Sequence, residues 1–311
     1  MSRVDLINQL MEQYYANLVY TQEIQRLRLF LRQKYCCEDD EQLLMEMQKL
    51  GRNVNSQQHL TFMFASPLVI QRQNSDDYLE IDQLDWPGEW ANLRKALSDN
   101  NKAIKTRKIC GTLENLQLIL DEGTLVLHFS GHGQTEDAFQ GSEFREFHNK
   151  GDVLILESLV GTQNFLTKNQ LREYLHKKMD IKLVFVASCH SEQTGWTFHE
   201  AGIGHVICTR RETPIKDAAQ KKFTARFYRH LFSDEFSICE AFDKARRFIA
   251  SDSNPLIADE AFKFIIIRPK DKPYNINNQK AQKDFYEKIL RNQHDCPCKS
   301  IGAFEKGKLQ V

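Results

Sequence analysis

Short apolar runs alternate with amphipathic stretches through the middle of the chain. The runs Leu60–Ala65, Ile104–Cys110 and Leu125–Phe129 have the length of buried strands. The stretches between them place apolar residues three and four positions apart, as helices do. Strands that alternate with helices form a parallel sheet with covering helices. The pattern therefore predicts an α/β domain that begins near residue 56.

The same alternation continues in the second half of the chain. Thr167 and Gln170 form a capping box, which predicts a helix from there to about Met179. A buried strand then follows at Leu183–Ala187. The other elements that we predict are a short hairpin strand at Asp152–Leu156, a helix at Gln193–Glu200, a strand at His205–Cys208, two amphipathic helices through Phe223–Leu231 and Ile238–Ile249, and a last strand at Phe262–Ile267.

The two ends of the chain differ from this middle. Near the start, five apolar residues recur at steps of three and four and form a stripe on one helix face: Val4, Ile7, Met11, Tyr14 and Leu18. We predict a helical N-terminal segment over residues 1–55. Its stripe either packs on the body of the same chain, which the shortness of the run favours, or binds a partner or a second copy. Residues 270–311 are polar and predict a tail or linker with one weak helix.

Composition excludes several classes of function. The 42 basic and 42 acidic residues balance, and no long run has a single sign of charge, which argues against a nucleic-acid or membrane-surface partner. No apolar run reaches the ~18 residues that suggest a membrane span, and the first residues lack the apolar core of a secretory signal. These features predict a soluble, cytoplasmic protein. No glycine-rich phosphate loop follows the first strand, which disfavours a small-molecule α/β enzyme. No cofactor is predicted.

Eight cysteines are spread widely through the 311 residues, a spacing that does not suggest a disulfide framework. His294, Cys296 and Cys298 lie close together. They lack the paired Cys-x-x-Cys spacing of structural zinc sites, so no metal is predicted.

Two of the predicted strands end in residues that carry reactive groups. One ends in Ser130-Gly131-His132-Gly133, and the other in Ser188-Cys189-His190-Ser191. Because the carboxyl ends of neighbouring parallel strands open onto one edge of a sheet, an imidazole and a thiol would meet there. A thiol is mostly protonated at neutral pH and needs a nearby base, which His132 would supply. His190 is a rival base, but adjacent strand residues point to opposite faces, so we expect it to be the weaker one.

The sequences Phe129-Ser-Gly-His-Gly133 and Ala187-Ser-Cys-His-Ser191 together resemble the catalytic pair of caspase-like (clan CD) cysteine peptidases, in particular the CHAT-domain, separase and metacaspase branches. The resemblance covers about residues 59–268. It implies a three-layer α/β/α sandwich with a mostly parallel central sheet, preceded by the α-helical N-terminal segment. The peptidase domain would occupy residues 56–269.

The resemblance also implies roles for single residues. Cys189 would be the nucleophile, His132 the catalytic histidine, and the backbone N–H groups of Gly133 and Cys189 the oxyanion hole. Gly133 has a physical reason to be glycine, because it lets backbone and substrate approach closely.

The substrate pocket departs from the metacaspase pattern. Metacaspases usually have an Asp two places before the nucleophile, which helps to hold a substrate Arg or Lys, and a Gly after the second Ser. Here these places hold Ala187 and Glu192. Strict specificity for basic residues is therefore not expected unless Glu192 or Asp152 reaches the pocket.

Two functions remain open from the sequence. The leading hypothesis is a cysteine endopeptidase that cleaves specific protein partners, in signalling or defence as the resemblance implies. The alternative is a catalytically silent CHAT-like interaction module. Such a module would commonly lack the Cys or the His, and this chain has both.

Overall fold

The computed structural model describes residues 58–71, 78–100, 104–139, 150–158, 161–175, 181–233, 235–274 and 279–291. The predicted N-terminal helices with their apolar stripe lie outside these residues. The His294, Cys296 and Cys298 group also lies outside them.

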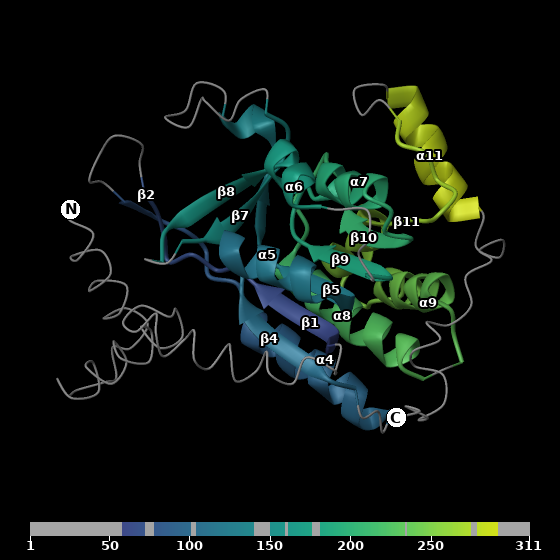
Figure 1. The fold of residues 1–311 in the computed structure, drawn as a ribbon. Helices are drawn as coiled ribbons and strands as arrows, with labels where there is room; N and C mark the ends of the chain where they lie inside the picture. Colours follow the sequence, from purple (N-terminus) through teal and green to yellow (C-terminus); the bar gives the residue numbers. More distant parts are fainter. Residues whose placement is uncertain are drawn as a thin grey trace.

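A six-stranded sheet forms the centre of the fold (Figure 1). Its strands lie in the order β11-β10-β9-β5-β1-β4, and only the edge strand β11 runs antiparallel to its neighbour. Every residue of β5, β9 and β10 is buried, as expected for central strands covered on both faces. The strand bounds are β1 Gln58–Phe64, β4 Thr106–Cys110, β5 Thr124–Ser130, β9 Leu183–Ala187, β10 His205–Thr209 and β11 Phe264–Ile267.

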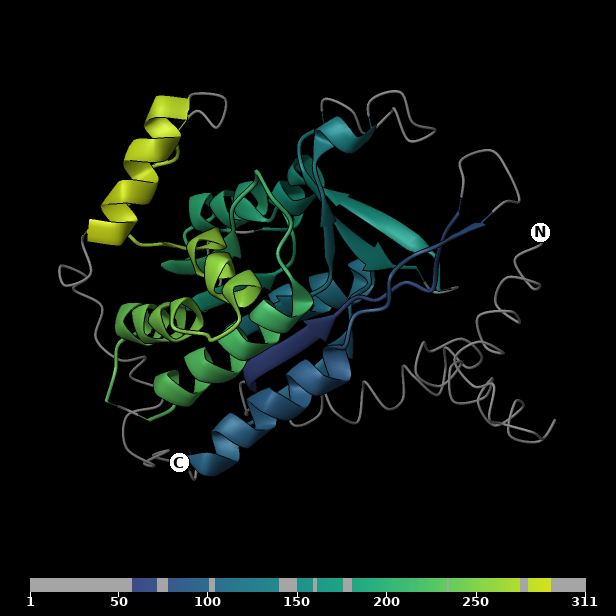
Figure 2. The same ribbon diagram turned by 180° about the vertical axis from the view of Figure 1, so that it is seen from behind.

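Helices cover both faces of this sheet. Helices α4 (Trp86–Asp99), α8 (Asp217–Leu231) and α9 (Ile238–Ala250) pack side by side on one face (Figure 2). Helices α5 (Leu113–Glu122) and α7 (Glu192–Glu200) lie on the other (Figure 1). The predicted three-layer α/β/α sandwich with a mostly parallel sheet is confirmed. In the described part of the chain, no helix is long and apolar enough to cross a membrane.

A smaller antiparallel sheet continues directly from the centre of the large one. It consists of β6 (His132–Gln134), β7 (Val153–Glu157) and β8 (Gln163–Thr167). The hairpin strand predicted at residues 152–156 is confirmed as β7, which pairs with both of its neighbours. Only Gly131 separates β5 of the large sheet from β6 of the small one. His132 therefore lies at the junction of the two sheets.

The predicted capping box is present at the start of α6 (Lys168–Tyr174), where Thr167 and Gln170 bond to each other's backbone N–H groups. The helix is shorter than predicted and does not run to about Met179. It ends at Tyr174, because Leu175 adopts an extended backbone with φ −83° and ψ 116°.

The weak helix predicted within residues 270–311 is present as α11. Helix α11 (Gln279–Arg291) packs on the body of the domain, and its Phe285 and Tyr286 are buried. Phe285 packs against Trp196 of α7, with ring centroids 5.2 Å apart. The polar composition of α11 gave no sign of this contact, because only two of its described side chains, both aromatic, are buried against the domain. The remaining short elements are β2 Val69–Gln71, β3 Tyr78–Glu80, η1 Glu136–Phe139, α10 Pro255–Ala258 and η3 Asp259–Lys263.

Candidate active site

The ends of β5 and β9 bring the two sequence motifs together. Ser130 of β5 lies opposite Ala187 of β9 in the parallel register, so both strands stop at the same level. The N–H of Gly131 donates a hydrogen bond of 3.2 Å to the Ala187 carbonyl. The motif residues His132 and Cys189 then follow two positions after these paired residues. The predicted meeting of the two strand ends is therefore present in the fold.

Gly133 is the point of closest approach between the motifs. A Cβ atom added there would lie 2.1 Å from the carbonyl oxygen of Cys189 and 2.4 Å from Oγ of Ser188. Real Cβ atoms do not approach backbone so closely, so only glycine fits without a shift of one segment. The backbone of β6 thus lies directly against the turn that carries the thiol.

Cys189 and His190 lie in a turn beyond β9, not in the strand itself. Oγ of Ser191 and Oγ1 of Thr209 donate hydrogen bonds of 2.9 Å and 2.6 Å to the Ser188 carbonyl and hold this turn. His190 has a left-handed φ of 52°, and its Nδ1 donates to the Arg211 carbonyl. The strand-alternation argument against His190 was therefore wrong, because strand geometry ends at Ala187. The bond to Arg211 is what holds its ring.

The His132 ring is oriented by a main-chain carbonyl. Its Nε2 lies 2.8 Å from the oxygen of Asp82, in the segment that leads into α4. A carbonyl oxygen only accepts hydrogen bonds, so Nε2 carries the proton and neutral His132 has its lone pair on Nδ1. Burial lowers the pKa of His132, although the bond to Asp82 opposes this shift. A neutral imidazole with a free Nδ1 is the form that a general base requires.

The Cys189 thiol is held in its protonated form. Its Sγ donates a weak hydrogen bond of 3.7 Å to the carbonyl of Ile215. Burial raises the pKa of the thiol, and the bond to Ile215 only partly offsets this effect. In the described structure, each of the two side chains bonds to a main-chain carbonyl and not to the other. The pair is thus neutral at rest.

The loop over residues 210–216 that contacts the thiol is fixed by Glu260 and Lys263. Nζ of Lys263 donates to the Pro214 carbonyl at 2.7 Å and to Oε1 of Glu260 at 2.9 Å. The N–H of Lys216 donates to Oε2 of the same carboxylate at 3.1 Å. We call Glu260 and Lys263 the loop clamp. It holds Ile215, which is 8% exposed, against Cys189.

The three residues predicted for the substrate pocket are all buried. Ala187 is 0% exposed within the core. Glu192 accepts hydrogen bonds from the hydroxyls of Tyr274 and Tyr286, and burial raises its pKa despite them. Asp152 accepts two bonds, of 3.0 Å and 2.9 Å, from Nε of Arg211. Ala187 has no carboxylate, and the carboxylates of Glu192 and Asp152 are both engaged in hydrogen bonds within the protein.

A buried polar cluster behind the site was not predicted. The carboxylate of Glu89 accepts hydrogen bonds from Ser130 at 2.6 Å and from Thr224 at 2.7 Å, and lies 3.2 Å from Nε2 of His128. Burial alone would raise the pKa of Glu89, but His128 and the two hydroxyls outweigh it and lower the pKa. The cluster ties α4 to the end of β5. The sequence contains a signal for it, because Glu89 lies on the apolar face of α4 between Trp86 and Leu93.

Of the cysteines that the structure describes, Cys189 alone is not buried, whereas Cys110, Cys208 and Cys239 are. Over the same residues, no group of three or more His, Cys, Asp or Glu side chains is arranged to hold a metal ion. The half-buried thiol is therefore the one at the junction of the two motifs.

A comparison with protein families decides the wider classification. The family model described as the CHAT domain matches residues 9–285. The chain belongs to the CHAT-domain family. A CHAT domain is caspase-like, in agreement with the observed sandwich. The match extends beyond the predicted 56–269 domain at both ends, and those boundaries stay a prediction. No curated protein matches the chain.

Proposed function

We propose that this CHAT domain is a cysteine endopeptidase in which Cys189 and His132 form the catalytic dyad. The observation that best supports this is the contact between Gly133 and the Cys189 carbonyl. It holds the ends of two neighbouring parallel strands, one bearing an imidazole and the other a thiol, against each other. The caspase-like family adds a second, independent line of support.

The first half of the reaction forms an acyl-enzyme. Nδ1 of His132 takes the Sγ proton as the thiolate attacks the carbonyl carbon of the scissile peptide. The oxyanion that forms would be held by the backbone N–H groups of Gly133 and Cys189. The tetrahedral intermediate then breaks its C–N bond, and the imidazolium gives its proton to the leaving amine.

The second half releases the acyl group. Neutral His132 takes a proton from a water molecule as that water attacks the thioester carbon. The C–S bond then breaks, and the proton passes to the thiolate. Each cycle consumes one water molecule and restores the neutral pair.

The resting contacts favour low activity before a substrate or activator binds. The thiol donates its hydrogen bond to the Ile215 carbonyl and not to Nδ1 of His132, so productive geometry requires this bond to break. We therefore expect low basal turnover. The substrates would be specific proteins, in signalling or defence as the family resemblance implies.

Labelling with a peptide acyloxymethyl ketone tests the dyad. The native protein should be labelled at Cys189, and Cys189→Ala should abolish labelling. His132→Ala should slow it by about 10²- to 10⁴-fold, the usual contribution of a general base. His190→Ala is the matched control and should stay within about threefold of native. Circular dichroism checks that each variant folds. A folded protein in which no variant changes labelling would favour the silent interaction module.

The preference for the substrate residue on the amino side of the cleaved bond depends on the carboxylates that the predicted substrate pocket can offer. Glu192 and Asp152 are both engaged, and Ala187 provides no carboxylate. A desolvated charge partner contributes about 2–5 kcal/mol at an interface, so we predict weak or no preference for Arg or Lys. A fluorogenic peptide panel measures this. Strong cleavage after Arg or Lys that survives Glu192→Gln and Asp152→Asn would contradict the prediction.

A further inference from the structure

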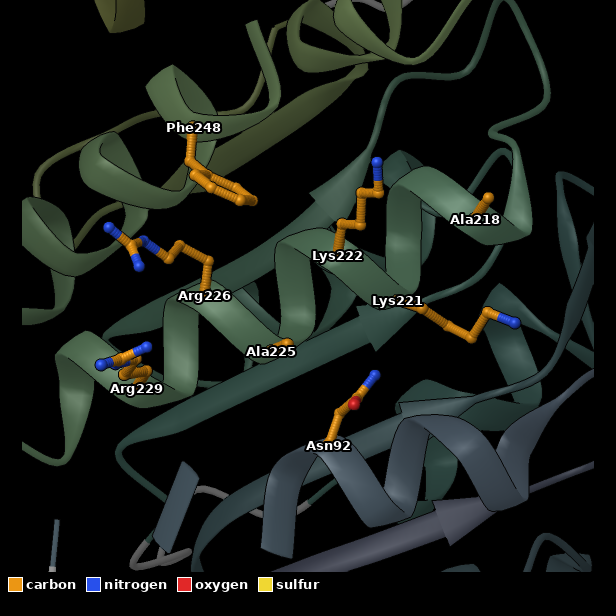
Figure 3. A pocket seen from close by; sticks show the side chains of 8 residues that line it. All are labelled: Asn92, Ala218, Lys221, Lys222, Ala225, Arg226, Arg229 and Phe248. Atoms are coloured by element: carbon orange, nitrogen blue, oxygen red, sulfur yellow. The ribbon is translucent and has the colours of Figure 1, made fainter. Parts of the chain in front are cut away.

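A groove of about 510 Å³ lies on the helical face away from α7, between α4, α8 and α9 (Figure 3). Its floor is one face of α8, where Ala218, Lys221, Lys222, Ala225, Arg226 and Arg229 follow helical spacing. Asn92 of α4 and Phe248 of α9 line its two sides. No step of the proposed catalysis uses this surface.

The cations of the groove fall into two groups. Lys221 forms ion pairs with Asp85 at 2.7 Å and Asp217 at 3.0 Å. Lys222 forms one with Asp252 at 2.5 Å. Arg226 and Arg229, by contrast, form no ion pair with any carboxylate of the described residues. Two guanidinium groups are therefore available to an incoming acid.

Arg226 is already arranged for such a contact. Its Nε is buried and has no hydrogen-bond partner within the described structure. Its guanidinium carbon lies 4.8 Å from the ring centre of Phe248, which fixes the direction of the side chain. A buried donor without a partner is costly, so a ligand carboxylate or carbonyl that displaces the atoms covering Nε would remove an existing penalty.

The shape of the floor fits a helix. Ala218 and Ala225 lie seven residues apart, two helical turns, and their small side chains let another backbone approach closely. Phe248 is 43% exposed and adds apolar surface beside them. Because Arg226 lies over the Phe248 ring, that face is not free to stack on a nucleic-acid base. Small and aromatic apolar side chains beside two guanidinium groups favour a protein ligand.

We infer that the groove binds an amphipathic, acidic α-helix of a protein partner. Apolar residues three and four apart would lie on the alanines and Phe248, and flanking Glu or Asp side chains would pair with Arg226 and Arg229. The whole chain has no net charge, so the positive charge of the two unpaired guanidinium groups belongs to the groove and not to the protein surface in general. This binding does not depend on the proposed catalysis.

The groove is connected to the candidate site through α8. Nε2 of Gln220 donates to the Ala187 carbonyl at 3.2 Å, two residues before Cys189. Nζ of Lys221 donates to Asp85, which caps α4 three residues after Asp82, the acceptor for His132. A helix bound on α8 would thus contact the element that bonds to Ala187 of one motif and to the segment that holds His132 of the other.

Fluorescence anisotropy with the full chain tests the inference. The probe is a fluorescein-labelled peptide of roughly 16 residues, about 24 Å long as a helix, with Leu three and four apart and Glu beside them. The control peptide replaces each Glu by Lys. We expect saturable binding of the acidic peptide alone, weakened by added salt. The double variant Arg226→Gln/Arg229→Gln should bind it about fivefold or more weakly, as expected when two exposed ion pairs are lost.

The matched control is Lys270→Gln/Lys272→Gln, which removes two exposed cations elsewhere and should bind like the native chain. Circular dichroism shows whether the variants fold, and Phe248→Ala provides a second variant without any change of charge. Equal binding of both peptides, or equal losses in both double variants, would overturn the inference. Tighter binding of a single-stranded RNA that competes with the peptide would also overturn it in favour of a nucleic-acid surface.

Discussion

At the residue scale, Gly133 sets the distance between the two motifs. We predict that Gly133→Ala lowers the labelling rate of Cys189 by about 10²-fold, because an added Cβ would lie 2.1 Å from the Cys189 carbonyl and must displace the reactive turn. The strain should also destabilise the fold by about 1–3 kcal/mol. Labelling kinetics and thermal unfolding measure the two effects.

Gly204→Ala is the matched control, since a Cβ there would meet only Pro269 at an ordinary 3.6 Å. It should leave both quantities near their native values. A Gly133→Ala protein with native labelling and stability would show that β6 and the turn move apart freely.

The protonation of the resting pair predicts an unusual pH dependence. Because burial raises the pKa of Cys189 above its usual value near 9, the reactive thiolate forms only at higher pH. The rate of iodoacetamide alkylation should therefore still be rising above pH 9, with no plateau near neutrality. Peptide mapping by mass spectrometry separates Cys189 from the other cysteines. A plateau below pH 8 would instead indicate a thiolate–imidazolium pair.

The sequence indicated the residues proposed to react but not the atoms that orient them. His132, Cys189 and Gly133 stand in short motifs after apolar runs, where residue type reveals chemistry. The acceptors at Asp82 and Ile215 are main-chain carbonyls, which every residue has, so no sequence pattern marks them. Glu89 is intermediate between these cases. Its place on an apolar helix face was visible, but its partners come from β5 and α8.

At the scale of elements, the loop clamp controls how the loop over residues 210–216 sits on the thiol. We predict that Lys263→Met increases local opening of this loop, because the Pro214 carbonyl and Glu260 both lose a charged donor. Losing such a bond costs about 1–2 kcal/mol, so amide hydrogen exchange over residues 213–217 should become about 5- to 30-fold faster.

Lys222→Met, which removes an ion pair with Asp252 and leaves the loop clamp intact, serves as the control. Its exchange over residues 213–217 should match that of the native chain. If Lys263→Met also exchanged at the native rate, packing of Ile215 rather than the clamp would hold the loop.

Prediction of elements succeeded where periodicity was strong and failed where tertiary contacts decide. The central strands and the helices through Phe223 and Phe242 follow clear apolar patterns. Helix α6 stops early because of the backbone at Leu175, which the sequence pattern does not mark. The packing of α11 depends on Phe285 and Tyr286 meeting Trp196 and Glu192, a contact across many residues that no local window contains.

At the scale of the whole molecule, the N-terminal segment has a testable role. We predict that deleting residues 1–56 changes either the labelling rate of Cys189 or the oligomeric state, because the stripe from Val4 to Leu18 is too regular for a passive leader. Light scattering and labelling kinetics on the truncated and full chains measure both. If neither quantity changed, the stripe would serve packing alone.

The pairing of β5 with β9 has a consequence for the order of events during folding. The two residues of the proposed dyad stand 57 positions apart in sequence, and their strands lie side by side at the centre of the sheet. Contacts between distant segments form late, because closing a long loop costs entropy before any pairing compensates it. A growing or partly folded chain thus holds its thiol and imidazole separately. Topology itself would delay assembly of the proposed dyad until β5 and β9 have paired.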